Sequence, residues 1–310
     1  MSEPSVPQAF AAALDALIVQ VQKDRSILAA ILCGSLSHDT VWAKSDIDLV
    51  LITIDDKKVA VSDVPLYADG VNVHAMLLPR TEFRKAVEGS IQNSLMHSFL
   101  AKGRLLYTHD ETIAALCARL HALGSRDATI QKLSAATAVL PALYKARKWF
   151  VTRNDYSYTA LWLLYASMPI AKLEVISAGR LADREVIPEA AKLNPPLFET
   201  IYTDLLRTGT QKEPVEKALE TMEAYMARRA PEVFAPVLEY LQEAGDVRSS
   251  REIEDHFQKN FNVSGITTAC EYLADLGLIS KASTPVLLTK RSNTSLEELA
   301  FFFSEPADGR

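Results

Sequence analysis

The most informative parts of this chain are Ile31-Leu-Cys-Gly-Ser-Leu-Ser37 and Lys44-Ser-Asp-Ile-Asp-Leu-Val50. The first ends a short apolar run with a Gly-Ser pair, and the second opens another apolar run with an Asp-x-Asp sequence. Apolar runs of this length are typical of buried strands. Because side chains alternate along a strand, Asp46 and Asp48 are expected on one face, with Ile47 in the core. The sequence therefore predicts two carboxylates that converge at the start of a strand.

This carboxylate pair predicts a metal-nucleotide site. Neighbouring carboxylates repel each other unless a divalent cation lies between them, and Mg²⁺ prefers oxygen ligands shared between carboxylates and substrate phosphates. Asp46 and Asp48 are therefore the expected ligands of Mg²⁺ or Mn²⁺. Gly34 lets the backbone approach a phosphate closely, and the Ser35 hydroxyl can donate to triphosphate oxygens. We expect Gly34, Ser35 and the adjacent Ser45 to bind the nucleotide.

The order of these motifs resembles the signature of the DNA polymerase β-like nucleotidyltransferase superfamily, which includes aminoglycoside and lincosamide nucleotidyltransferases. The shared features are the Gly-Ser pair that closes a strand, ten intervening residues, and Asp-x-Asp at the next strand. The resemblance covers about residues 25–110. It implies Mg²⁺-dependent transfer of a nucleoside monophosphate from an NTP to a hydroxyl of a small molecule or protein. One departure is that Asp39 or Thr40 stands where the superfamily often has a further glycine.

A second departure concerns the third carboxylate, which the superfamily usually carries on its third strand. In Val71-Asn-Val-His-Ala-Met-Leu-Leu78 the corresponding face offers Asn72, His74 and Met76. His74 is the first choice for this position, as base or spacer, because a neutral imidazole accepts a proton near pH 7; Asp69 is the second. A packed strand histidine is the alternative. A degenerate nucleotidyltransferase that serves as a nucleotide-sensing or interaction module therefore stays open beside the enzyme.

The pattern of elements predicts an α+β fold with three domains. Residues 1–125 form the nucleotidyltransferase domain, a small mixed sheet with flanking helices. Its strands are expected at 27–33, 47–54, 71–78 and 104–108, with a hairpin turn at Asp69-Gly70. Helices are expected at 8–24, at 81–101 with Thr81 as N-cap, and at 111–123.

Residues 126–230 read as a helical bundle domain with breaks at proline, glycine and Asn-Asp sites, among them Pro141, Asn154-Asp155 and Pro169. Lys145 and Lys148 share one helix face. They are interpreted either as ligands of the triphosphate or as solvated surface charge.

Residues 231–310 resemble a winged helix-turn-helix. Helices are expected at 233–243, 250–261 and 265–276, with Ser264 as an N-cap, followed by short strands at 278–279 and 286–289 around a wing. The helix at 265–276 shows Glu271 and Asp275, an acidic face that suits a protein contact or a homodimer better than nucleic acid.

The charge, the apolar runs and the cysteines of the sequence indicate which kinds of partner and location to expect. The net charge is −6, with the acidic excess in residues 231–310, so DNA is not the expected main partner. We find no apolar run in the sequence that approaches the roughly 20 residues of a membrane span, and no pattern of a secretory signal. These observations predict a cytoplasmic protein without a membrane partner. Cys33, Cys117 and Cys270 are odd in number and widely spaced, which favours free thiols.

Overall fold

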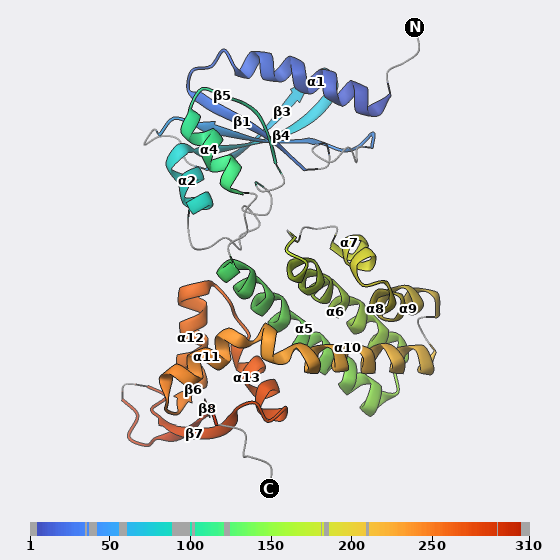
Figure 1. Cartoon of the computed structure of the whole chain (residues 1–310), viewed down its shortest axis with the longest axis vertical. Coiled ribbons are helices and arrows are strands. Elements are labelled where there is room, and N and C mark those ends of the chain that lie inside the picture. Colours follow the sequence, from blue (N-terminus) through green and yellow to red (C-terminus); the bar gives the residue numbers. More distant parts are fainter. Residues whose placement is uncertain are drawn as a thin grey trace. The chain divides into compact units, whose positions relative to one another are not determined.

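The computed structural model describes residues 5–34, 36, 42–55, 61–88, 100, 103–120, 125–180, 182, 186–208, 211–289 and 291–304. The chain divides into two compact units, residues 1–123 and 124–310 (Figure 1). Each unit has its own arrangement of sheet and helices.

A five-stranded mixed sheet forms the centre of the first unit. Its strands are β1 (Ile27–Cys33), β2 (Ile47–Thr53), β3 (Ser62–Ala68), β4 (Val71–Pro79) and β5 (Arg104–Thr108). They lie in the order β3-β4-β2-β1-β5, with β2 and β4 parallel and the other neighbours antiparallel. The small mixed sheet predicted from the sequence is confirmed.

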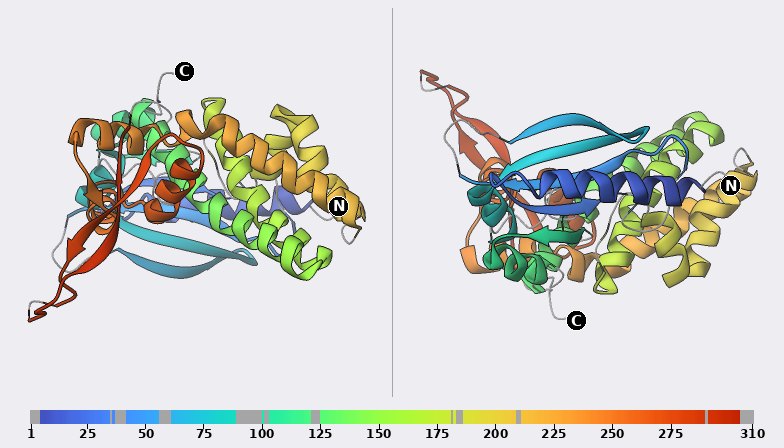
Figure 2. Two further views of the ribbon diagram at one scale, coloured as in Figure 1. Left: turned by 90° about the horizontal axis from the view of Figure 1, so that it is seen from below. Right: turned by 90° about the horizontal axis from the view of Figure 1, so that it is seen from above.

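Helices cover both faces of this sheet. Helix α1 (Val6–Val21) runs along one face (Figure 2) and packs its buried apolar residues against alternate residues of β1, β2 and β4. Helices α2 (Arg80–Glu88) and α4 (Glu111–Leu120) lie on the other side (Figure 1). The Asp48 side chain therefore belongs to the face opposite α1, because its neighbours Ile47 and Leu49 pack in the α1 core.

Several local predictions for this unit are corrected. Asp69 and Gly70 have positive φ angles of 45° and 85° and form the expected turn between β3 and β4, but β3 itself was not predicted. Thr81 lies inside α2 and is not its N-cap; its backbone amide donates to Asp55 across the fold at 2.7 Å. Most of the expected helix beyond Glu88 lies outside the described residues.

The second unit begins with long helices. Its first elements are α5 (Ser125–Arg153), α6 (Tyr156–Ser177), α7 (Val186–Leu193), α8 (Pro195–Phe198), the π-helical turn η2 (Glu199–Thr203), α9 (Asp204–Thr208) and α10 (Lys212–Val233). Asn154, with φ of 51°, separates α5 from α6 as expected. The breaks predicted at Pro141 and Pro169 are wrong, since both prolines lie inside helices whose buried faces hold them in place.

The remaining elements follow in the order α11 (Ala235–Ala244), β6 (Arg248–Ser249), α12 (Ser250–Phe261), α13 (Ile266–Asp275), β7 (Ser280–Val286) and β8 (Leu296–Phe302). The three strands form a sheet in the order β6-β8-β7. The β7–β8 hairpin extends away from the helices of this unit (Figure 2). The strands predicted at 278–279 and 286–289 are wrong: these segments flank β7, with only Val286 inside it, and β8 was not predicted.

One core runs through the whole second unit. Buried apolar residues from α5 to β8 belong to a single cluster, from Leu133 to Phe301, and α13 contacts α5. A separate domain that begins near residue 231 therefore stays a prediction.

Helix α6 is long and apolar enough, by length and composition, to cross a membrane, with a mean hydropathy of 1.3. The sequence prediction concerned uninterrupted apolar runs, and Lys172 and Glu174 interrupt the apolar sequence of this helix. About half of the helix, 56% of its apolar window, is buried inside the second unit, as in the core helix of a soluble protein. Tyr158, Leu161, Tyr165 and Met168 of this helix are exposed.

Candidate functional site

Gly34 and Asp48 bring the two halves of the sequence motif into contact. Strand β1 pairs with β2 so that Cys33 lies opposite Asp48, and Gly34 follows directly with a positive φ of 65°. A Cβ atom at Gly34 would lie 1.9 Å from Oδ2 of Asp48. The left-handed backbone favours glycine at this position, and any side chain would displace the Asp48 carboxylate from the space that it occupies.

The two predicted metal ligands lie at the start of β2. Ile47 is fully buried, whereas Asp46 is exposed and the Asp48 side chain is 30% exposed. The expected alternation is therefore present, with the apolar residue in the core. Both carboxylates are accessible enough to bind an ion that also contacts solvent or a substrate.

His74 lies beside Asp48 because β2 and β4 are parallel and in register. The two residues are direct partners across the strands, and His74 Nδ1 is 3.6 Å from Asp48 Oδ1. The other ring nitrogen, Nε2, is 3.4 Å from Oδ1 of Asp63 on β3. The imidazole thus lies between two carboxylates, and about half of it is exposed.

Asp63 is the site residue that sequence reasoning missed. The signal was available: counting back from the Asp69-Gly70 turn pairs Pro65 with His74, which places Asp63 on the same face of the sheet. Asp69, the second choice for the third carboxylate, forms the turn itself with φ of 45°.

The donors suit a magnesium ion that is shared with a substrate. Within the described part of the chain, no group of three or more His, Cys, Asp and Glu side chains is arranged to hold a metal. Two carboxylates are nevertheless the protein ligands expected for Mg²⁺ where phosphates and water complete the coordination. The residues therefore fit a metal bound together with a nucleotide.

Of the two serines predicted to bind the nucleotide, Ser45 has a described position. Ser35 lies outside the described residues. Ser45 closes a turn directly before Asp46: its hydroxyl accepts from the Trp42 amide at 3.1 Å, and its own amide donates to the Trp42 carbonyl at 2.9 Å. This turn fixes the entry of the chain into the carboxylate pair.

Cys33 lies next to the site but is not a nucleophile. Its thiol is fully buried, and burial, with a smaller effect of Asp48, raises its pKa far above the ordinary value. The thiol therefore stays protonated at neutral pH. Cys33, Cys117 and Cys270 are all free, as expected.

Lys145 and Lys148 lie on exposed positions of α5 in the second unit. Lys145 Nζ is 4.1 Å from the centre of the Trp162 ring. Arg147, between the two lysines, is paired with Glu223 through two hydrogen bonds, so it adds little net positive charge. A role of the lysines in nucleotide binding stays a prediction.

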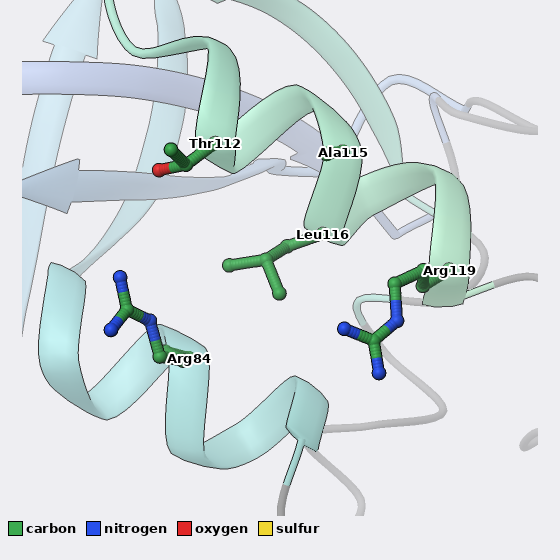
Figure 3. Close-up of a pocket in the computed structure, with 5 residues that line it drawn as sticks. All are labelled: Arg84, Thr112, Ala115, Leu116 and Arg119. Atoms are coloured by element: carbon green, nitrogen blue, oxygen red, sulfur yellow. The ribbon is translucent and has the colours of Figure 1, made fainter.

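A separate cavity of about 290 Å³ lies between α2 and α4 (Figure 3). Leu116 forms its apolar floor, and the guanidinium groups of Arg84 and Arg119 reach into it from the two helices. Its lining contains none of the predicted site residues, so the cavity is distinct from the carboxylate pair.

Comparison with solved structures identifies the fold. No protein-family model matches the sequence, and no curated protein matches it. The crystal structure of a nucleotidyltransferase-like protein from Exiguobacterium sibiricum superposes with a TM-score of 0.63 over 95% of this chain and 99% of the other, at 14% identity. The chain therefore has a nucleotidyltransferase-like fold over nearly its whole length.

Proposed function

We propose that the protein is a Mg²⁺-dependent nucleotidyltransferase that transfers a nucleoside monophosphate from an NTP to a hydroxyl of a small molecule or protein. The observation that supports this most is the contact between Gly34 and Asp48. It places a left-handed backbone without a side chain directly beside one of the two carboxylates. Such an arrangement is useful for binding a phosphate next to a metal ligand.

Each residue has a distinct task in this proposal. Asp46 and Asp48 hold Mg²⁺, which when bound neutralises phosphate charge. Gly34 leaves room for a phosphate beside its backbone, and Ser35 binds it. The Ser45 hydroxyl accepts a hydrogen bond from Trp42, which leaves its proton for a phosphate oxygen. Positioning of the acceptor hydroxyl in line with the α-phosphorus then drives transfer.

His74 is the proposed base or spacer. A neutral imidazole donates at one nitrogen and accepts at the other. With Asp63 as partner of Nε2, the Nδ1 atom faces the Asp48 side of the site and can accept the proton of an attacking hydroxyl. In the spacer role, the ring only separates the two carboxylates.

The test is Mg²⁺-dependent pyrophosphate release from each of the four NTPs with a panel of hydroxyl acceptors. Wild type, Asp46→Asn and Asp48→Asn are compared, and nucleotide binding is measured in parallel. We expect release from wild type and at least a hundredfold less from either variant, in line with the loss of a metal ligand. Full activity of either variant contradicts the proposal.

A second candidate is a degenerate nucleotidyltransferase that senses nucleotides or mediates an interaction. It is favoured by the position of His74, which stands opposite Asp48 where a third carboxylate is expected. This candidate predicts Mg²⁺-dependent nucleotide binding that Asp48→Asn removes, without pyrophosphate release for any acceptor.

We further infer that residues 231–310 are a winged helix-turn-helix that contacts protein, in a cytoplasmic protein. Support comes from the order α11-β6-α12-α13-β7-β8 and from the β6-β8-β7 sheet. Helix α13 contacts α5 and carries Glu271 and Asp275. DNA affinity that falls steeply with salt would overturn this inference.

A further inference from the structure

Helix α6 carries an apolar stripe that the second unit does not cover. The stripe consists of Tyr158, Leu161, Tyr165 and Met168, whose exposed fractions are 37%, 40%, 58% and 47%. Their spacing of three, four and three residues places them along one side of the helix. An aliphatic or aromatic side chain exposed alone is ordinary, but four in one row mark an interaction surface.

The opposite side of α6 is already part of the core. Buried residues such as Leu163, Ile170 and Leu173 pack in the central cluster of the unit. Between Tyr158 and Met168 the helix is therefore apolar both on its buried side and along the stripe, a property of helices that are buried on more than one side. This accounts for its high mean hydropathy, and it predicts that a further apolar surface covers the stripe.

The aromatic part of the stripe is held in place before anything binds. Tyr158 lies edge-on to Trp149 at 4.6 Å between ring centres and near Trp162 at 6.1 Å. Tyr165 packs against Trp162 at 5.5 Å. Because these rings already have neighbours, they lose little conformational freedom on binding, which favours association.

We propose that the stripe is a homodimer interface in which α6 pairs antiparallel with α6 of a second copy. Alternating steps of three and four residues are the spacing of coiled-coil seams. An antiparallel pair centred on residue 163 places Leu161 against Tyr165 of the second copy and Tyr158 against Met168. The four stripe residues of one copy are then covered by the four stripe residues of the other copy.

Charge at the ends of the stripe favours this orientation. The next residue in the spacing is the exposed Lys172. In the antiparallel pair it faces the uncharged Asn154 of the second copy, which lies between Arg153 and Asp155, the residue that caps the start of α6. Within the stripe no charged side chain opposes another, so the two copies meet without repulsion. A parallel pair would bring Lys172 against Lys172.

Four side chains from each copy form a small interface, so the dimer is expected to dissociate in the range of roughly 1–100 µM. Sedimentation of the full chain over this range tests it. Leu161→Glu and Tyr165→Glu should each weaken the dimer at least tenfold. Leu206→Glu is the matched control, since Leu206 on α9 is 59% exposed and lies outside the stripe. Circular dichroism checks that all variants fold.

Cysteine cross-linking tests the orientation independently. Tyr158→Cys and Met168→Cys should form a disulfide-linked dimer only when the two variants are mixed. Within one antiparallel pair, identical positions lie about 15 Å apart along the helix, beyond the reach of a disulfide. A wild-type chain that stays monomeric at 100 µM overturns the proposal. So does an equal loss of dimer in Leu206→Glu, or cross-linking of each cysteine variant alone.

Discussion

Asp48 occupies the space in which a side chain at Gly34 would begin, with its Oδ2 only 1.9 Å from the ideal Cβ position. Gly34→Ala must therefore displace the carboxylate as well as strain a backbone with φ of 65°. We expect a loss of about 2 kcal/mol in the free energy of unfolding and loss of Mg²⁺-nucleotide binding, measured by urea unfolding and calorimetric titration.

Gly70→Ala is the control for this prediction. Gly70 has a similar positive φ of 85°, but no atom lies within 4 Å of its Cβ position. Backbone strain should lower the free energy of unfolding of Gly70→Ala by about 1 kcal/mol, and the variant should keep its nucleotide affinity. Equal effects of the two substitutions on nucleotide binding would show that the contact with Asp48 has no role there.

A third carboxylate can be restored at the position of His74. His74→Asp places a carboxylate directly opposite Asp48 on the parallel strand. We expect lower thermal stability in EDTA, because like charges meet, and roughly tenfold tighter Mg²⁺ binding, because an oxygen ligand is added. Melting temperatures with and without Mg²⁺ measure both effects.

Gln20→Asp is the control, at an exposed position of α1 on the opposite face of the sheet. It adds the same charge without facing Asp46 or Asp48. A gain in Mg²⁺-dependent stability equal to that of His74→Asp would place the metal elsewhere.

Asp110 is expected to make the first unit sensitive to acid. Hydrogen bonds from Thr112 and from Arg80, together with the Arg80 charge, lower the pKa of its carboxyl group in the folded protein. The stabilisation is therefore complete above the unfolded pKa of about 3.9 and is lost as pH falls through the lower folded value. Asp110→Asn should be less stable than wild type at pH 7 and should lose less stability on acidification. Urea midpoints at pH 7 and 3 check this; parallel changes in both proteins would contradict it.

Two ion pairs of the second unit should differ in energetic weight. Glu174 and Arg229 are only 15% and 14% exposed, and Glu174 also accepts from Tyr225 and Asn194. Glu174→Ala removes one carboxylate from the buried guanidinium of Arg229. This should lower the free energy of unfolding by about 3 kcal/mol. Glu223→Ala breaks the more exposed pair with Arg147 and should cost about 1 kcal/mol or less. Urea unfolding of both variants decides the order, and a larger loss for Glu223→Ala would reverse it.

The parts of the fold that depend on local sequence were predictable. The apolar runs of β1 and β2 and the Asp69-Gly70 turn follow from side-chain pattern and backbone preference. The same pattern placed Asp46 and Asp48 at the start of a strand. Helix α12 begins and ends at the predicted residues, because Ser249 and Glu252 form a local capping box.

The parts that depend on distant contacts were not. Strand β3 contains Pro65 and little buried surface, and it exists because it pairs as the edge strand with β4. Ser264 does not cap α13; the Glu254 carboxylate does, by accepting from the amides of Gly265 and Thr267. Asp63 was missed for the same reason, since its place beside His74 follows from the pairing of β3.

The middle position of β8 has a consequence for how the protein is made. Strands β6 and β7 become neighbours in one sheet only through β8, which is the last of the three to leave the ribosome. Until then, both earlier strands have an unpaired edge, and the buried Phe301 is missing from the core. During synthesis the second unit therefore passes through a stage with exposed strand edges to which a chaperone can bind. That stage ends when β8 pairs with β6 and β7.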